Sequence, residues 1–169
     1  MGLSDEEIKN RVISAADFVG LNYEDLQKSP FELSGGQKRK AAIAGVIAMD
    51  PQVLILDEPT AGLDPQSKTD LLNKIKLYQK SKNNTIILVS HNMDDIANIT
   101  NRVMVLNKGK IFMCDSTENV FSHPEKLSQI GLKIPVATCI AQRLNEKGYN
   151  INSSTLSVDE LVQQIISIN

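Results

Sequence analysis

The chain has 169 residues, of which 41% are hydrophobic and 22% are charged, and its formal net charge is -2. The length predicts one domain with a single core, and the weak net charge excludes an overall positive field that would attract nucleic acid or anionic lipid. Because no run approaches the roughly 18 consecutive apolar residues that cross a bilayer, we expect any role at a membrane to depend on a partner.

The first predicted element is a short amphipathic helix that follows Ser4. Ser4 and Glu7 have the spacing of a capping box, and apolar residues then recur at helical spacing as far as Gly20. Residues 21–32 include Pro30 and other turn-forming residues, which predicts a loop or a short turn. This loop leads into the most informative segment of the chain.

A second helix is predicted from Gly36 to about Met49, and a serine and two glycines lie at its start, in the segment Leu33, Ser34, Gly35, Gly36 and Gln37. The unpaired N–H groups and the dipole of a helix N-terminus favour anions, and glycine lets a phosphate approach the backbone. Taken alone, this segment favours an ordinary capped helix with a glycine turn over a phosphate site. Residues further along the chain favour the second interpretation, a phosphate-binding site at this helix start.

An apolar run from Val53 to Leu56 predicts a strand buried on both faces of a parallel sheet. Asp57 and Glu58 follow at its carboxyl end, where ligands bind in open α/β sheets. In phosphoryl transfer Asp57 can help to hold Mg²⁺ while Glu58 polarises the attacking water. The alternative, that the two acids cap the next helix, is weak because Pro59 follows directly.

Asp64 lies in a predicted tight turn, where it either reaches another subunit or forms an ordinary Asp-Pro turn. A helix over 70–80 and a second buried strand over 85–89 come next. His91 follows that strand, so we expect it at the same sheet edge as Glu58, in reach of a γ-phosphate. A lone histidine after a strand is otherwise a surface or cap residue.

The remaining elements complete an α/β pattern followed by a helical tail. A short helix over 94–100 precedes two strands, 102–106 and 110–114, which a turn joins into a hairpin. Alternating strands and helices are typical of a sheet built by crossovers. The tail is predicted to contain helices over 118–121, 125–130, 136–147 and 158–168.

These segments together resemble the nucleotide-binding domains of ATP-binding cassette (ABC) proteins. The sequences LSGGQ at 33–37, VLILDEP at 53–59, AGLD at 61–64 and SH at 90–91 occur in the order of that family. In the family, the signature segment of one subunit covers the γ-phosphate of ATP held by the opposite subunit. The resemblance implies that residues 33–37 bind the partner's ATP, Asp57 serves Mg²⁺, Glu58 is the catalytic base, Asp64 links the two sites and His91 is the switch residue.

A finer resemblance is to the ATPases of energy-coupling factor transporters, which import cobalt, nickel and vitamins. It rests on the sequence SGGQKRKAAIAGVIAMDPQVLILDEPTAGLDPQ and on the tail around 117–135. This resemblance implies a second ATPase subunit, identical or different, a transmembrane coupling subunit and a substrate-binding membrane protein. It also implies a peripheral location at the cytoplasmic face of the cell membrane and no nucleic-acid partner.

The chain also departs from the family pattern, because no GxxxxGK followed by Ser or Thr occurs in it. We therefore expect a partial P-loop NTPase core that lacks the N-terminal β region and the Walker A loop. The expected domains are 1–115, with a signature part to about 50 and a core over 51–115, and a helical extension over 116–169. We further expect the chain to be truncated, and inactive by itself.

Two other functions stay open at this point. One is the carboxyl lobe of a split ATPase for DNA repair or chromosome maintenance, although a long coiled coil would precede such a lobe and only one short helix is predicted before the signature. The basic run from Lys38 to Lys40 is more simply a solvated helix face than a DNA contact. The other is a regulatory module without catalysis, which donates its signature face to an intact cassette.

Overall fold

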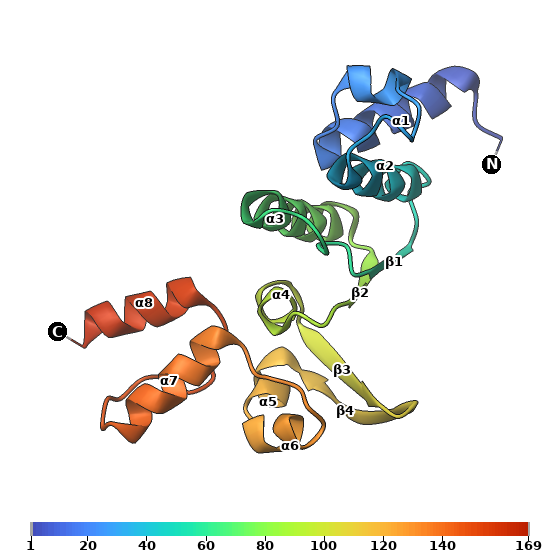
Figure 1. Ribbon diagram of the computed structural model, residues 1–169. Coiled ribbons are helices and arrows are strands. Elements are labelled where there is room, and N and C mark those ends of the chain that lie inside the picture. Colours follow the sequence, from blue (N-terminus) through green and yellow to red (C-terminus); the bar gives the residue numbers. More distant parts are fainter. Residues whose placement is uncertain (1, 169) are drawn as a thin grey trace. The chain divides into compact units, whose positions relative to one another are not determined.

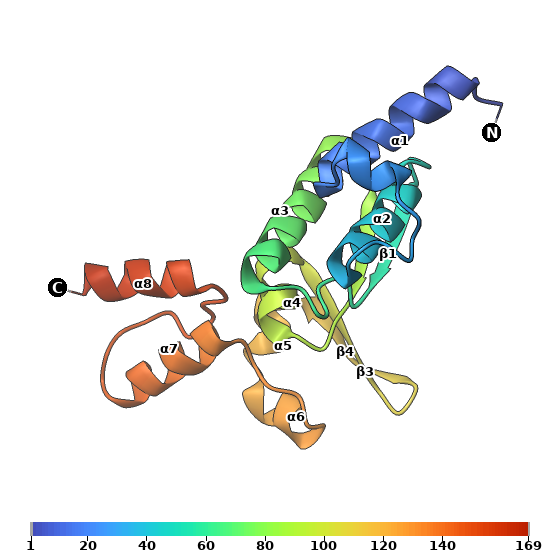
Figure 2. The same cartoon turned by 45° about the horizontal axis from the view of Figure 1, so that its top comes forward.

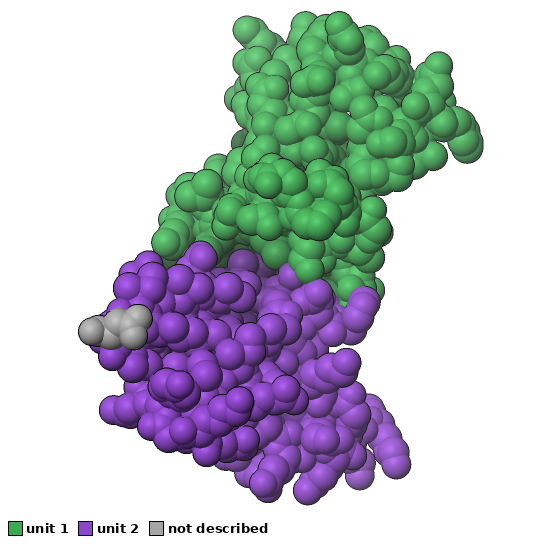
Figure 3. Space-filling model, turned by 60° about the vertical axis from the view of Figure 1, so that its left-hand side comes forward, with its two compact units in different colours: residues 1–89 green, residues 90–169 purple. Residues whose placement is uncertain are grey.

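The computed structural model describes residues 2–168, and the chain forms two compact units, residues 1–89 and residues 90–169 (Figure 1, Figure 3). Each unit combines helices with a two-stranded sheet. The α/β class predicted from the sequence is confirmed. The domain boundary predicted after residue 115 falls inside the second unit and stays a prediction.

Local signals explain where the helices of the first unit begin and end. In chain order its elements are α1 (Asp5–Val19), the 3-10 helix η1 (Tyr23–Gln27), α2 (Gly35–Ile47), β1 (Val53–Asp57), α3 (Pro65–Lys82) and β2 (Thr85–Val89). Ser4 closes a capping box on α1, and Gly20 ends this helix with a left-handed φ of 75°. Asp64 caps α3, which therefore begins at Pro65 rather than at the predicted Asp70.

The strands β1 and β2 pair in parallel. Their register runs without a break from Val53 opposite Thr85 to Asp57 opposite Val89. The carboxyl ends of both strands therefore meet at one edge of this sheet, as the sequence predicted. That edge holds the acidic pair at the end of β1.

The expectation that β1 is buried on both faces is wrong for the part of the chain that the structure describes. Leu54 and Leu56 are buried, whereas the alternate residues Val53 and Ile55 are 52% and 64% exposed. Side chains alternate between the two faces of a strand, and the helices of this unit form a core with only one of them. Figure 2 shows α2 and α3 beside these strands, with α1 packed against α2.

One core cluster joins these helices to the sheet. Its buried members are Ala15, Ala16, Val19, Leu21, Ile43, Ala44, Ile47, Leu54, Leu56, Leu71, Ile75 and Tyr78. Both α2 and β1 contribute to it, so the start of α2 and the end of β1 belong to the same packed body. The signature segment and the acidic pair therefore extend from elements that share one core.

The second unit contains a hairpin and five helices among its described residues. They are α4 (Met93–Ile99), β3 (Arg102–Asn107), β4 (Lys110–Ser116), α5 (Thr117–Phe121), α6 (Pro124–Gln129), α7 (Val136–Glu146) and α8 (Val158–Ser167). The strands β3 and β4 pair antiparallel. Lys108 and Gly109 turn the hairpin with φ of 49° and 74°, the backbone that a two-residue turn of the primed type requires. The predicted hairpin and tail helices are confirmed.

Two separate clusters stabilise this unit. One surrounds the fully buried Phe121 and Leu127, and the other joins α7 to α8 through Ala141 and Leu161. A buried hydrogen bond also closes the tail, because Thr138 Oγ1 donates to the Thr155 carbonyl at 2.6 Å. Across residues 2–168, no helix is both long and apolar enough to span a membrane.

Candidate functional site

The start of α2 is a capped helix N-terminus with free donors. Ser34 Oγ accepts from the Gln37 N–H at 3.2 Å, and Gln37 Oε1 accepts from the Ser34 N–H at 2.9 Å. The first N–H groups of a helix, here those of Gly35 and Gly36, have no acceptor within the helix. Ser34 and Gly35 are exposed. The Ser34 hydroxyl keeps its own hydrogen for donation, so serine and glycines together present donors to an external anion.

A second layer of contacts holds Gln37, and sequence reasoning missed it. Gln37 Nε2 donates to Asp25 Oδ1 at 3.0 Å, and Lys28 Nζ lies 2.7 Å from the same oxygen. The hydrogen bond from Lys28 holds the pKa of the buried Asp25 carboxyl below its usual range. The spacing of Asn22 and Asp25 is that of a capping box on η1, but nothing in the sequence indicates the contact with Gln37, twelve residues away.

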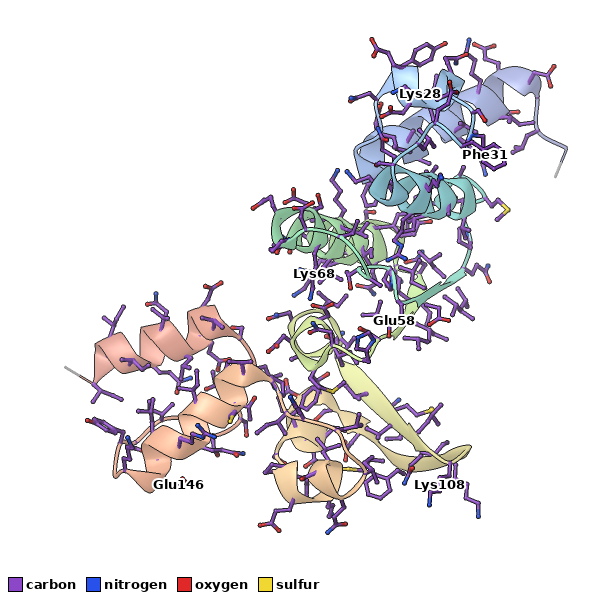
Figure 4. All side chains as sticks on the ribbon, in the orientation of Figure 1. Lys28, Phe31, Glu58, Lys68, Lys108 and Glu146 are labelled. Carbon is purple, nitrogen blue, oxygen red and sulfur yellow. The ribbon has the colours of Figure 1, made fainter. Side chains whose placement is uncertain are left out.

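The acidic pair lies at the carboxyl end of β1, where the sequence placed it. Asp57 is the last residue of the strand and is exposed, and Glu58 is half-buried. The Glu58 N–H donates to the Val89 carbonyl at 2.9 Å, which continues the pairing with β2 by one step. Glu58 then leaves the strand with a left-handed φ of 46°, and Figure 4 labels it at this position.

The signature helix and the acidic turn are in direct contact. Arg39 Nη1 donates to the Glu58 carbonyl at 3.1 Å and also to the Ala61 carbonyl. At the start of the same helix, a Cβ on Gly36 would lie 3.4 Å from Leu63 Cδ2. The predicted segments 33–37, 57–58 and 61–64 are therefore brought together within the first unit, and Arg39 was not foreseen as the residue that joins them.

Asp64 caps α3. Its Oδ1 accepts from the Ser67 N–H at 2.9 Å, and hydrogen bonds from Ser67 lower the pKa of the Asp64 carboxyl. The turn is thus the ordinary Asp-Pro cap that the sequence left open as one alternative. The exposed position of Asp64 leaves the other alternative, a contact with a second subunit, as a prediction.

His91 belongs to the second unit. It is exposed and follows β2 two residues after Val89, the strand end that pairs with Asp57. Its predicted place beside Glu58 stays a prediction. Within residues 2–168, no group of three or more His, Cys, Asp or Glu side chains could hold a metal ion by itself. The predicted role of Asp57 toward Mg²⁺ stays a prediction.

Residues 4–61 match the family model of the ABC transporter. The chain is 49% identical over 166 residues to the energy-coupling factor transporter ATP-binding protein EcfA2 of Caldanaerobacter subterraneus, which covers 98% of this chain and 58% of the relative. The chain thus spans somewhat under three fifths of that relative's length.

Two solved structures of ABC transporter proteins are also similar to this chain. The structure of cbiO1 from Clostridium perfringens, part of the ABC transporter complex cbiONQ, is 35% identical with a TM-score of 0.64 and covers 88% of this chain and 55% of that one. MJ0796, a bacterial ABC transporter cassette solved as a dimer, is 25% identical with a TM-score of 0.63 and covers 69% and 50%. The match over residues 4–61 and the 49% identity to EcfA2 together show that this chain contains part of an ABC transporter domain.

Proposed function

We propose that this chain is part of the ATP-binding subunit of an energy-coupling factor importer, in which ATP hydrolysis drives uptake of a metal ion such as cobalt or nickel, or of a vitamin. The observation that supports the proposal is the contact between the signature helix and the acidic turn, which belong to one packed unit. The relative named EcfA2 and the cbiO1 structure support the importer class.

Each residue of the surface has a chemical task in this proposal. The Ser34 hydroxyl and the amides of Gly35 and Gly36 donate to the γ-phosphate of ATP held by a second subunit, while Leu33 and Gln37 shape this helix start. Glu58 orients and deprotonates the attacking water. Bound Mg²⁺ would offset phosphate charge, and the exposed Asp57 carboxylate fits it because Mg²⁺ prefers oxygen ligands and keeps part of its water shell.

The assembly follows from this division of tasks. A signature surface that serves another subunit's ATP requires a second ATPase subunit, identical or different, and MJ0796 is a cassette solved as a dimer. Asp64 would connect the two ATP sites, and His91 would contact the γ-phosphate. A transmembrane coupling subunit and a substrate-binding membrane protein would complete the importer, with this subunit peripheral at the cytoplasmic face of the membrane.

The 169-residue chain by itself is inactive in this proposal. Its sequence contains no GxxxxGK motif, whose amides and lysine would hold the phosphates of the subunit's own nucleotide. Titration of the purified chain with Mg²⁺-ATP in a calorimeter should therefore show no saturable binding in the micromolar range. A micromolar dissociation constant would contradict this part of the proposal.

The test of the function uses an intact ATPase that includes this chain. Glu58→Gln should lower turnover by about a hundredfold or more, because a general base contributes about 10²–10⁴ to the rate, and it should stabilise the ATP-bound dimer in size-exclusion chromatography. Glu6→Gln, an exposed acid on α1, is the matched control and should keep normal turnover. Undiminished hydrolysis by the Glu58 variant would contradict the proposal. Uptake of labelled cobalt, nickel or vitamins by the reconstituted importer then identifies the substrate.

A further inference from the structure

We infer that Arg39 is a positioning residue that couples the two ATP sites served by one subunit, by tying the signature helix to the turn that carries Glu58. The inference rests on the proposed function, because in the dimer Ser34 serves the partner's nucleotide while Glu58 serves the subunit's own. A side chain that fixes one segment against the other can transmit the state of one site to the other. Arg39 makes that connection in the structure.

One nitrogen of the Arg39 guanidinium group makes both hydrogen bonds of this contact. Arg39 is half-buried, and its Nη1 donates both to the Glu58 carbonyl at 3.1 Å and to the Ala61 carbonyl. A guanidinium has several donors in a fixed plane, so it can hold two carbonyls of one turn in a set orientation. The neighbouring Lys38 is exposed on the same helix and has the same charge.

The backbone that Arg39 holds is strained. Glu58 has a φ of 46°, a left-handed conformation that is unfavourable for a residue with a Cβ and persists only where its surroundings maintain it. One side of the turn is fixed by the Glu58 N–H, which donates to Val89 at 2.9 Å. The other side depends on the Glu58 carbonyl, which accepts from Arg39 and from the Ala61 N–H at 3.2 Å. If Arg39 is replaced, the Glu58 carbonyl loses one of these two donors and keeps the Ala61 N–H.

A second contact carries the coupling to the phosphate-facing end of the helix. The helix start at Gly36 lies against Leu63, since a Cβ at Gly36 would be 3.4 Å from Leu63 Cδ2. Movement of the turn between Glu58 and Leu63 therefore shifts a neighbour of the signature segment. Arg39, one turn further along α2, keeps the two segments from moving independently. Engagement of phosphate at Ser34 is thereby transmitted to the backbone of Glu58.

The experiment measures ATP hydrolysis by an intact ATPase that includes this chain. Arg39→Gln should lower kcat about tenfold, leave KM for ATP within about twofold and reduce the Hill coefficient for ATP toward one, because coupling residues typically alter the barrier by a modest amount without binding substrate. Lys38→Gln removes the same charge from the same helix and should behave as the unmodified enzyme. Arg39→Lys should recover part of kcat, since the ammonium group still has N–H donors but lacks the planar arrangement of the guanidinium.

Three outcomes overturn the inference. Normal kcat and Hill coefficient in Arg39→Gln would do so, as would a fall in kcat with an unchanged Hill coefficient, which indicates a merely structural role. If Arg39→Gln does not fold, Arg39→Lys is compared by hydrogen exchange, and unchanged protection of the Ala61 and Leu63 amides would also refute it. Glu58→Gln tests the proposed function separately from the role of Arg39. If Glu58→Gln abolishes turnover, the proposed function is supported even where the Arg39 variants contradict the coupling role.

Discussion

The two units differ in how their packing relates to exposed functional groups. In the first unit, one core cluster contains residues of both α2 and β1, and Ser34 and Asp57 lie at the ends of these elements. In the second unit, two smaller clusters are supplemented by polar contacts, such as the Asp94 Oδ1 that accepts from the Val136 N–H at 2.9 Å. A single core holds all the elements that carry a site in one arrangement. Where the core is divided into two clusters, the position of each cluster's elements depends on a few contacts between them.

The largest expected effect concerns the cluster around Phe121 in the second unit. Phe121 is 1% exposed, and Phe121→Ala should lower the free energy of unfolding of this unit by about 3–5 kcal/mol, because a cavity remains where the ring was. Native-state hydrogen exchange measures the effect at the amide of Val105, on β3. The comparison predicts that protection at Ile87, on β2 of the first unit, changes much less.

Leu54→Ala is the matched change in the first unit. Leu54 is also 1% exposed, and its truncation should lower the local free energy of unfolding by about 2–5 kcal/mol at Ile87. If either variant reduced protection equally in both units, they would unfold as one body and the comparison would be broken.

The next effect tests whether polar contacts stabilise the tail of the second unit. Thr138 is fully buried, and Thr138→Val should destabilise this unit by about 1–3 kcal/mol because the Thr155 carbonyl loses its donor. The matched control is Thr69→Val on α3, where an exposed Thr69 Oγ1 donates to the Pro65 carbonyl at 3.0 Å. Water replaces that donor, so a change of less than about 0.5 kcal/mol is expected in urea unfolding. An equal loss of unfolding free energy in the two variants would show that burial does not change the contribution of these hydrogen bonds to stability.

The sequence predicts the elements of both units for local reasons. Capping at Ser4, the hairpin turn at Lys108 and Gly109, and the acids that follow β1 each depend on neighbours within a few residues. The exposed face of β1 was not predictable, because an apolar run does not reveal which of its faces is covered. The contact of Arg39 with Glu58 was missed for a related reason, since it joins residues 19 positions apart.

A smaller effect compares two serine caps, one in each unit. Ser34 caps α2 and Ser157 caps α8, each accepting from a backbone N–H three residues later at 3.2 Å. Both Ser34→Ala and Ser157→Ala should therefore lower the free energy of unfolding by about 1 kcal/mol. In the intact ATPase only Ser34→Ala should weaken ATP-dependent dimerisation, measured by size-exclusion chromatography with Glu58→Gln present. Equal weakening by both would remove the functional difference between the caps.

The smallest expected effect is an acid dependence that both units share. Hydrogen bonds from Ser67 lower the pKa of Asp64 in the first unit, and the Ser116 N–H, with Asn119, lowers the pKa of Asp115 in the second. A lowered pKa means that the unfolded chain binds protons first as the pH falls. The contribution of each carboxylate is thus fully present above about pH 3.9, the ordinary value for aspartate, and is lost as the pH falls through the lower folded value.

Substitution by asparagine separates this titration from the hydrogen bonds themselves. Asparagine still accepts at a helix cap but does not ionise, so Asp64→Asn should flatten the fall of the urea midpoint as the pH decreases below about 3.9, while retaining α3. Asp115→Asn should flatten it likewise for the second unit. If the slope of the urea midpoint against pH stays unchanged in Asp64→Asn but decreases in Asp115→Asn, the acid sensitivity belongs to the second unit alone. Asp64 would then stabilise the start of α3 through its hydrogen bond and not through its charge.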